Sequence, residues 1–182
     1  MAADPFLKAL GPVEDLPEAV SQLHMTDGRF SGQCDIVRGA GILASFATRL
    51  AGFPLNGHDV PVSVTISAEG EALCWQRDFG GHCTTSHLTY DAKRNCVRED
   101  FGAISIWLQP NLLNGSLYIK ILRLTVLGIP MPIFALPRSD TREWQDALGR
   151  FRFDVSAEAP GLGLLIRYQG WLTLDHAMHE AG

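Results

Sequence analysis

An arginine on an apolar strand face is the first place in this sequence where residue type and spacing point to chemistry. In residues 71–81 (EALCWQRDFGG), Arg77 alternates with Trp75 and Phe79, so the three side chains share one face of a strand. A buried guanidinium needs a carboxylate or other acceptors, because an unpaired charge in an apolar interior is very costly. The sequence therefore predicts that Arg77 is at least half buried and paired with Glu99 or Asp154.

The same residues suit a small-molecule site, which is usually an apolar cavity with a few polar groups that orient the ligand. Four residues are expected ligand contacts: Trp75, Arg77, Ser86 and Tyr168. Glu99 and Asp154 are candidate catalytic residues, since a carboxyl group desolvated in such a cavity would act as a general acid or base. Arg77 or Tyr168 would then stabilise the developing oxyanion. A purely structural alternative stays open, in which arginine–carboxylate pairs only hold strands together.

Metal and nucleophilic chemistry find less support in the spacing of the histidines and cysteines. The six histidines are dispersed, and the four cysteines form no C-x-x-C pair. Cys83 follows His82 directly, and neighbouring side chains of a strand point to opposite faces. No G-x-S-x-G elbow is present, and no G-x-G-x-x-G stands in a βαβ unit. The sequence therefore predicts no metal site, no cofactor and no Rossmann-type nucleotide binding.

Composition and charge narrow the class of protein. A chain of 182 residues that is 46% hydrophobic and 19% charged suits one folded domain with a substantial core. The net charge of −5 and the scattered basic residues argue against a nucleic-acid partner. No apolar stretch is long enough for a transmembrane helix, and the N-terminal residues lack the pattern of a secretory signal. With cysteines interpreted as reduced thiols, these features predict a cytoplasmic protein.

The elements that must position the candidate residues are mostly strands. Alternating patterns predict about eight of them, at residues 29–37, 60–67, 71–81, 82–90, 96–110, 116–128, 150–155 and 164–172. Short turns join most of these strands, including residues 91–95 and the Asn114-Gly115 pair, a hairpin signal. Short turns favour an antiparallel meander, because parallel strands need long crossover connections. In the last hairpin, Phe153 and Val155 should share the apolar side with Tyr168.

Helical patterns are confined to the first third of the chain. Residues 4–24 look helical in pieces, and residues 39–54 predict one amphipathic helix with Ile42, Leu43, Phe46 and Leu50 on one face. A long antiparallel sheet tends to curl or close, which removes its edges. The predicted fold is therefore mainly β, an antiparallel meander curled into a barrel or half-barrel with one or two N-terminal helices. An α+β sheet wrapped around a helix is the alternative.

The predicted organisation is one domain with short appendages: an N-terminal helical arm (1–27), a β-rich domain (28–174) and a flexible tail (175–182). Several short motifs follow one another within the β-rich part: Trp75-x-Arg77-x-Phe79-Gly80, Ser86, Glu99 before Phe101-Gly102, Pro130 with Pro132, Phe153-Asp154-Val155 and Tyr168-x-Gly170-Trp171. In this order they resemble a bacterial family of domains of unknown function that often follow saccharopine-dehydrogenase-like oxidoreductases. The resemblance transfers no catalytic residue. It implies that the domain functions together with a redox enzyme, which for this chain would be a separate protein.

Three functions remain open at this point. The leading hypothesis is a β-enclosed pocket, independent of metal, that binds a lipid-like or polyketide-like small molecule. The second is a cofactor-independent isomerase or cyclase that uses Glu99 or Asp154 in the same pocket. The third is an interaction module that docks on an oxidoreductase and has no ligand. A large internal cavity would separate the first two hypotheses from the third.

Overall fold

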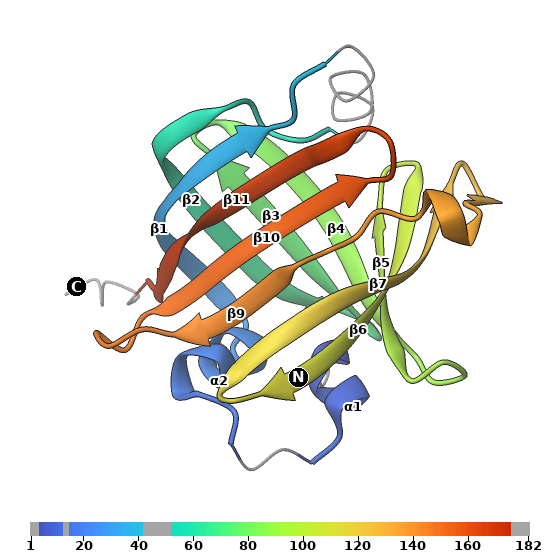
Figure 1. Ribbon diagram of the computed structural model, residues 1–182. Coiled ribbons are helices and arrows are strands. Elements are labelled where there is room, and N and C mark those ends of the chain that lie inside the picture. Colours follow the sequence, from blue (N-terminus) through green and yellow to red (C-terminus); the bar gives the residue numbers. More distant parts are fainter. Residues whose placement is uncertain (1–3, 13–14, 42–51, 176–182) are drawn as a thin grey trace.

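The protein is a closed antiparallel β-barrel with two short helices at one end (Figure 1). The computed structural model describes residues 4–12, 15–41 and 52–175, so most of the predicted 39–54 helix and of the predicted tail lie outside the described residues. None of the helices in these ranges is long and apolar enough to cross a membrane. The barrel confirms the mainly β prediction, and the alternative of a sheet wrapped around a helix is not observed.

The described residues form eleven strands, ten of which close a ring. Each strand of the ring pairs with its neighbour in the chain, and β1 pairs with β11 to close it. Around the ring the strands are β1 (Gly28–Arg38), β2 (Gly57–Glu69), β3 (Ala72–Phe79), β4 (His82–Asp91), β5 (Cys96–Phe101), β6 (Ile104–Leu113), β7 (Ser116–Val126), β9 (Thr141–Gln145), β10 (Phe151–Ala159) and β11 (Gly163–Leu174). The two-residue β8 (Ile129–Pro130) pairs with the end of β7.

Two of these strands differ from the sequence-based prediction. The segment 96–110 forms two strands, because the chain turns after Phe101 at Gly102, whose φ of 56° is a left-handed value that glycine adopts easily. β9 was not predicted as a strand. It turns Thr141 and Glu143 into the barrel and Arg142 outward, so its pattern lacks the usual apolar inner face. The predicted Asn114-Gly115 hairpin is confirmed, with positive φ at both residues.

Closure of the barrel depends on a close approach between β1 and β11. Gly170 lies opposite Cys34, and a Cβ atom at Gly170 would come within 2.2 Å of the Gln33 carbonyl oxygen. A Cβ atom at Gly32 would come within 1.8 Å of the Trp171 carbonyl oxygen. Only glycine fits at either position without moving the backbone. This explains the glycine in the Tyr168-x-Gly170-Trp171 motif.

The two helices close the lower end of the barrel in Figure 1. α1 (Pro5–Leu10) packs against β4, β5 and β6, and α2 (Glu18–Met25) packs against β9 and β10. Val20 and Leu23 of α2 are almost fully buried and join the same hydrophobic core as the strands. The helices therefore pack as a floor of the barrel.

Candidate functional site

The interior of the barrel holds a cavity of about 180 Å³ above the helical floor. Its wall is mostly apolar and comes from β3 to β7, β9, β10 and β11. Phe6 of α1 lies at its lower end, and Phe53, Phe101 and Ser139 come from the ends of strands and loops at the opposite end of the barrel. A second space of about 70 Å³ lies beside it, lined mainly by β2, β3, β10 and β11. Trp75, Arg77 and Tyr168 line both spaces, so the predicted ligand contacts stand where the two meet.

A polar cluster of Arg77, Ser86 and Glu99 crosses three neighbouring strands of the cavity wall. The Arg77 guanidinium donates to Ser86 Oγ (2.8 Å) and to Glu99 Oε1 (3.0 Å), and Ser86 Oγ also donates to Glu99 Oε1 (2.7 Å). The side chains of Arg77 and Glu99 are 18% and 15% exposed. The prediction of a buried arginine paired with Glu99 or Asp154 is therefore confirmed, with Glu99 as the partner.

This cluster leaves hydrogen-bonding capacity unused. Within the described ranges, Glu99 Oε2 accepts no hydrogen bond, and only two of the five N–H donors of Arg77 are engaged. The guanidinium also lies over the Trp75 ring, 5.0 Å from its centroid, a favourable cation–π arrangement. The cluster is thus fixed in place but still has an acceptor and donors for a further polar group.

Trp75 and Tyr168 add two more polar atoms without partners. The buried indole N–H of Trp75 has no acceptor among the described residues, and an unpaired buried donor costs about 1–3 kcal/mol. The Tyr168 ring lies between Phe79 and Phe153, at centroid distances of 5.4 and 6.1 Å, and its hydroxyl has no hydrogen-bond partner in the described part of the chain. Both groups are positions that a water or a ligand oxygen would satisfy.

The Tyr168 hydroxyl remains protonated at neutral pH. Burial raises the pKa of Tyr168 to about 12, while Arg77 lowers it and Glu99 raises it. The hydroxyl is thus available to donate a hydrogen bond to an oxygen inside the cavity.

Asp154 does not belong to this site. Phe153 and Val155 on either side of it line the interior, so the alternation of β10 turns Asp154 to the outer face. There its carboxylate forms a bidentate pair with Arg167 of β11. The hypothesis that Asp154 is a catalytic residue inside the pocket is therefore wrong, because Asp154 lines neither space and its carboxylate is engaged by Arg167 on the outer face.

A second buried cluster, of Asp4, His24 and Glu143, was missed by the sequence analysis. His24 Nδ1 lies 3.1 Å from Asp4 Oδ2, and His24 Nε2 lies 2.9 Å from Glu143 Oε2. Asp4 also caps α1 by accepting from the backbone N–H groups of Phe6 and Leu7. The cluster therefore joins α1, α2 and β9 at the floor of the barrel.

The charge state of His24 follows from these contacts. Burial alone would lower its pKa, but the carboxylates of Asp4 and Glu143 outweigh burial and raise the pKa to about 10. His24 is thus an imidazolium at neutral pH, held between two carboxylates. The partners are 20 and 119 residues away from His24 in the chain, so the spacing of residues along the sequence could not reveal the cluster. The one sequence signal is Asp4-Pro5, a favourable pair for starting a helix.

The barrel interior offers ligand binding more readily than metal or nucleophilic chemistry. The described residues place no trio of His, Cys, Asp or Glu ligand atoms at metal-binding distance inside the cavity. The three buried cysteines are free thiols, and burial raises the pKa of each of them, most strongly that of Cys34 to about 12, which disfavours the nucleophilic thiolate. What remains is an apolar cavity with one ion pair and two unpaired donors.

Comparison with known proteins supports the resemblance seen in the sequence. The model of a family described as Domain of unknown function (DUF4166) matches residues 16–172, which include α2, nine strands of the ring and all but the last two residues of β11. A comparison with curated proteins found no match. The chain therefore belongs to the family of the domain of unknown function DUF4166.

Proposed function

We propose that this barrel binds a small hydrophobic molecule that carries a neutral oxygen group, such as a hydroxyl or a ketone. The observation that carries the proposal is the polar cluster of Arg77, Ser86 and Glu99 in the wall of an otherwise apolar cavity. Such a composition is usual for small-molecule sites, in which a few polar groups orient an apolar ligand. Arg77 and Tyr168 would donate to a ligand carbonyl, and Glu99 Oε2 would accept from a ligand hydroxyl.

The charges inside the barrel favour a neutral ligand. Among the described residues, the carboxylates of Asp4, Glu99 and Glu143 face only two cations, Arg77 and protonated His24. A carboxylate or phosphate ligand would add a fourth negative charge in a region of low dielectric, where repulsion is strong. A polyketide-like ketone or an alcohol fits better than a fatty acid. This narrows the lipid-like or polyketide-like class expected from the sequence.

The volume sets an upper limit on what fits without side-chain movement. A cavity of about 150 Å³ in another protein is large enough to take up benzene. The cavity of about 180 Å³ therefore suits one ring or a short chain, and a longer ligand would extend toward Phe53 and Ser139 at the open end or into the adjoining 70 Å³.

The experiment is a fluorescence titration with two probes that share one skeleton. N-phenyl-1-naphthylamine is neutral, and 8-anilinonaphthalene-1-sulfonate adds a sulfonate to the same ring system. Both are larger than one ring, so each would extend from the cavity into the adjoining 70 Å³ or toward the open end. The neutral probe should bind at one site and about tenfold or more tighter than the sulfonate, a difference of about 1.4 kcal/mol. Equal affinity would contradict the neutral-ligand assignment. Absence of saturable binding of either probe would contradict the binding function itself.

Catalysis in the same cavity is the second candidate, favoured by Glu99 of β5 and a protonated Tyr168 of β11, which line the cavity from opposite sides of the ring. Glu99 would move a proton, and Tyr168 or Arg77 would stabilise the oxyanion of an enolised ketone. The contacts of Glu99 argue against catalysis. Its Oε1 accepts hydrogen bonds from both Arg77 and Ser86, as expected of a carboxylate that is held in place to accept from a ligand. Glu99→Gln separates the two: it would abolish solvent deuterium exchange into a bound ketone if Glu99 is a base, and would leave any such exchange unchanged if it only binds.

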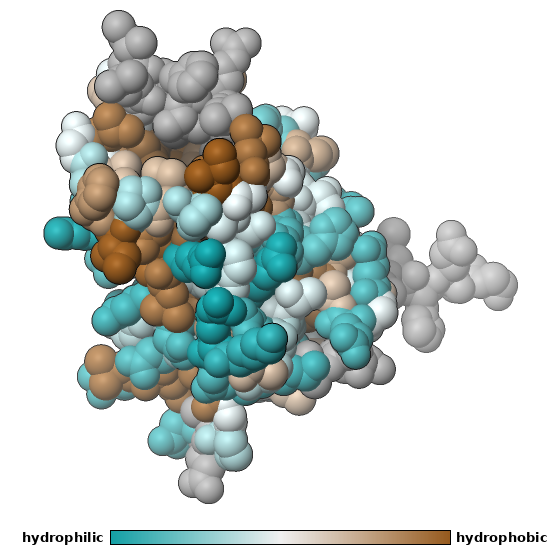
Figure 2. Space-filling model, turned by 90° about the vertical axis from the view of Figure 1, so that its right-hand side faces the viewer, coloured by the Kyte–Doolittle hydropathy of each residue, from teal (hydrophilic) through white to brown (hydrophobic). Residues whose placement is uncertain are grey.

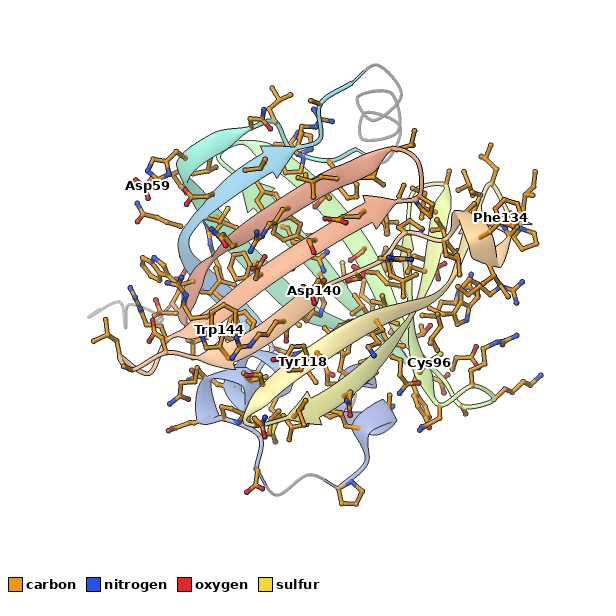
Figure 3. All side chains as sticks on the ribbon, in the orientation of Figure 1. Asp59, Cys96, Tyr118, Phe134, Asp140 and Trp144 are labelled. Carbon is orange, nitrogen blue, oxygen red and sulfur yellow. The ribbon has the colours of Figure 1, made fainter. Side chains whose placement is uncertain are left out.

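A partner protein would contact the barrel at an exposed apolar loop, residues 127–134, which follows β7. Ile133 is 88% exposed and Phe134 is 80% exposed, and Phe134 lies at the right-hand edge of the molecule (Figure 3). Hydrophobic residues gather in the upper half of the face that bears this loop (Figure 2). Exposed apolar patches often mark interaction sites.

We propose that this partner is a separate saccharopine-dehydrogenase-like oxidoreductase, as the family resemblance implies. We place the two proteins in the cytoplasm, because free cysteines suit its reducing conditions. A co-expressed enzyme of that class from the same genome should co-purify with the wild type. It should not co-purify with the Ile133→Ser, Phe134→Ser double variant, whose probe binding should be unchanged. Co-purification with both proteins would contradict this docking site.

A further inference from the structure

A group of three potential metal ligands lies on the outer face of the barrel, away from the cavity. Cys74 of β3 pairs with His87 of β4 in the antiparallel register, and Glu69 of β2 lies diagonally from Cys74, two positions beyond its partner Ser67. Leu73 and Trp75 point inward, so strand alternation turns Cys74 outward. Side chains that are opposite or diagonal on one sheet face are within reach of one another. The register itself therefore brings the three side chains together.

The distances between the ligand atoms of Glu69, Cys74 and His87 would have to change little for the three to bind one metal ion. One ligand atom of each residue lies within 4.8 Å of the other two, and His87 Nε2 is 3.2 Å from Glu69 Oε2. Ligands of one tetrahedral zinc ion lie roughly 3.5 Å apart, given metal–ligand bonds of about 2.0–2.3 Å. Glu69 is the last residue of β2 and about half exposed, so its side chain is free to move by the remaining distance. Cys74 and His87 sit within paired strands, which fixes the other two ligands.

We propose that Glu69, Cys74 and His87 bind a divalent transition-metal ion of the zinc class. A thiolate, an imidazole and a carboxylate together select zinc or cobalt over magnesium and calcium, which take oxygen ligands. Three protein ligands leave the fourth tetrahedral position to water. The ion would connect β2, β3 and β4, and the inner faces of β3 and β4 carry Trp75, Arg77 and Ser86. The sequence pattern pointed to no metal because the ligands belong to three different strands.

Metal binding would release a proton from Cys74. Coordination requires the thiolate, so binding should release about one proton per ion at pH 7. The buried position of Cys74 beneath Glu69 and His87 also protects it from solution thiol reagents, and bound metal should protect it further.

A second group, Asp35, His58 and Asp59, makes a useful comparison on the same molecule. It contains no sulfur ligand, and both nitrogens of His58 already pair with carboxylates. Asp59 lies at the left edge of the molecule in Figure 3, and the His58 side chain is largely exposed. A metal bound there would give no thiolate signal. Spectroscopy of a cobalt complex therefore distinguishes the two groups directly.

The experiment is a titration of the reduced protein with Co²⁺ followed by absorbance, and with Zn²⁺ followed by calorimetry. Co²⁺ should produce a thiolate-to-metal charge-transfer band and the intense visible bands of tetrahedral coordination, at one equivalent. Cys74→Ser should remove the charge-transfer band. His87→Gln removes a metal ligand, so it should weaken Zn²⁺ binding by more than roughly 10–100-fold, the loss that follows when a residue that only hydrogen-bonds to a ligand is removed. Cys83→Ser, which changes the exposed cysteine of β4, should leave both unchanged.

His87→Gln keeps the test valid if Cys74→Ser affects folding, because His87 lies on the surface. A wild-type protein that shows no thiolate band with one equivalent of Co²⁺ would overturn the proposal. A band that survives in Cys74→Ser and disappears in Cys83→Ser would overturn it as well. None of these results depends on the ligand proposed for the cavity.

Discussion

The described part of the barrel contains two buried charged clusters, and they differ in how many of their hydrogen-bonding groups are paired. At the floor, His24 is 0% exposed and both of its ring nitrogens pair with carboxylates. In the cavity wall, Arg77 and Glu99 keep 18% and 15% of their side-chain surface exposed, and part of their hydrogen-bonding capacity is unused among the described residues. The His24 ring therefore has nothing left for a ligand, although Glu143 also lines the cavity and its Oε1 accepts no hydrogen bond among the described residues. The cluster in the cavity wall is an incomplete polar network.

This difference separates a stabilising role from a binding role. The floor cluster joins two helices to β9, so breaking it should unfold or loosen the end of the barrel. The cavity cluster lies within strands already held by backbone pairing, so breaking it should change what the cavity binds more than whether the barrel forms. Variants of the two clusters should therefore divide cleanly between stability and affinity.

The largest expected effect is on stability, from His24→Ala. The change leaves Asp4 and Glu143 as buried carboxylates without their cation, and breaking a buried ion pair costs about 3–5 kcal/mol. Urea unfolding followed by tryptophan fluorescence measures the loss. His58→Ala, at a largely exposed histidine, is the matched control and should change stability far less. A loss below 1 kcal/mol in His24→Ala would show that the floor cluster contributes little.

The same cluster should make stability depend on alkaline pH. The folded-state pKa of His24 is raised from 6.5 to about 10, because Asp4 and Glu143 outweigh the effect of burial. A raised pKa gives stabilisation that is full below about pH 6.5 and is lost as pH rises toward 10. The unfolding free energy of the wild type should therefore fall across this range relative to His24→Gln. A constant difference between the two proteins would contradict the assigned charge of His24.

Arg77→Met should affect ligand affinity more than it affects stability. Removing the cation costs about 1–3 kcal/mol of stability, less than for a fully enclosed pair because the side chains are partly exposed. Loss of a charged donor should weaken binding of a ketone competitor by about tenfold or more. N-phenyl-1-naphthylamine, whose N–H is itself a donor, should be affected less. Arg138→Met is the control, since Arg138 is exposed outside the strands of the ring. Equal effects of the two changes would deny Arg77 a special role.

Tyr168→Phe should give the smallest change of the series. The hydroxyl has no partner among the described residues, so its loss should change the unfolding free energy by less than about 1 kcal/mol in either direction. Binding of an oxygen-bearing ligand should weaken by a few fold, the value of one neutral hydrogen bond of about 0.5–1.5 kcal/mol. Competition between the probe and a small aromatic ketone measures it. A stability loss well above 1 kcal/mol would mean that the hydroxyl has a structural partner.

Strand alternation explains which parts of the site the sequence predicted. Arg77 was identifiable because a charge interrupts the apolar face that also carries Trp75 and Phe79. The same rule excludes Asp154, whose neighbours Phe153 and Val155 take the inner positions. The barrel followed from the run of strands with short turns. The closure of β11 on β1 at Gly170 depends on a contact that local patterns do not contain.

The features that sequence reasoning missed are long-range or break the expected pattern. His24 meets Glu143 across 119 residues, and β9 presents Thr141 and Glu143 to the interior where an apolar face is expected. The outer trio of Glu69, Cys74 and His87 depends on the register of three strands. Spacing along a chain cannot show such groups, because the sheet and not the sequence makes them neighbours.

The central claim is that the cavity inside the barrel is the ligand site, and filling it tests this most directly. Ala157 of β10 lines the cavity, so Ala157→Phe would occupy the space without removing a polar group, at a cost of about 1–3 kcal/mol for overpacking. Ala147, exposed in the turn before β10, provides the control Ala147→Phe. Titration with N-phenyl-1-naphthylamine should show saturable binding to the wild type and to Ala147→Phe, and a loss of at least about tenfold in a folded Ala157→Phe. Undiminished binding to Ala157→Phe would place the ligand outside the cavity and contradict the account.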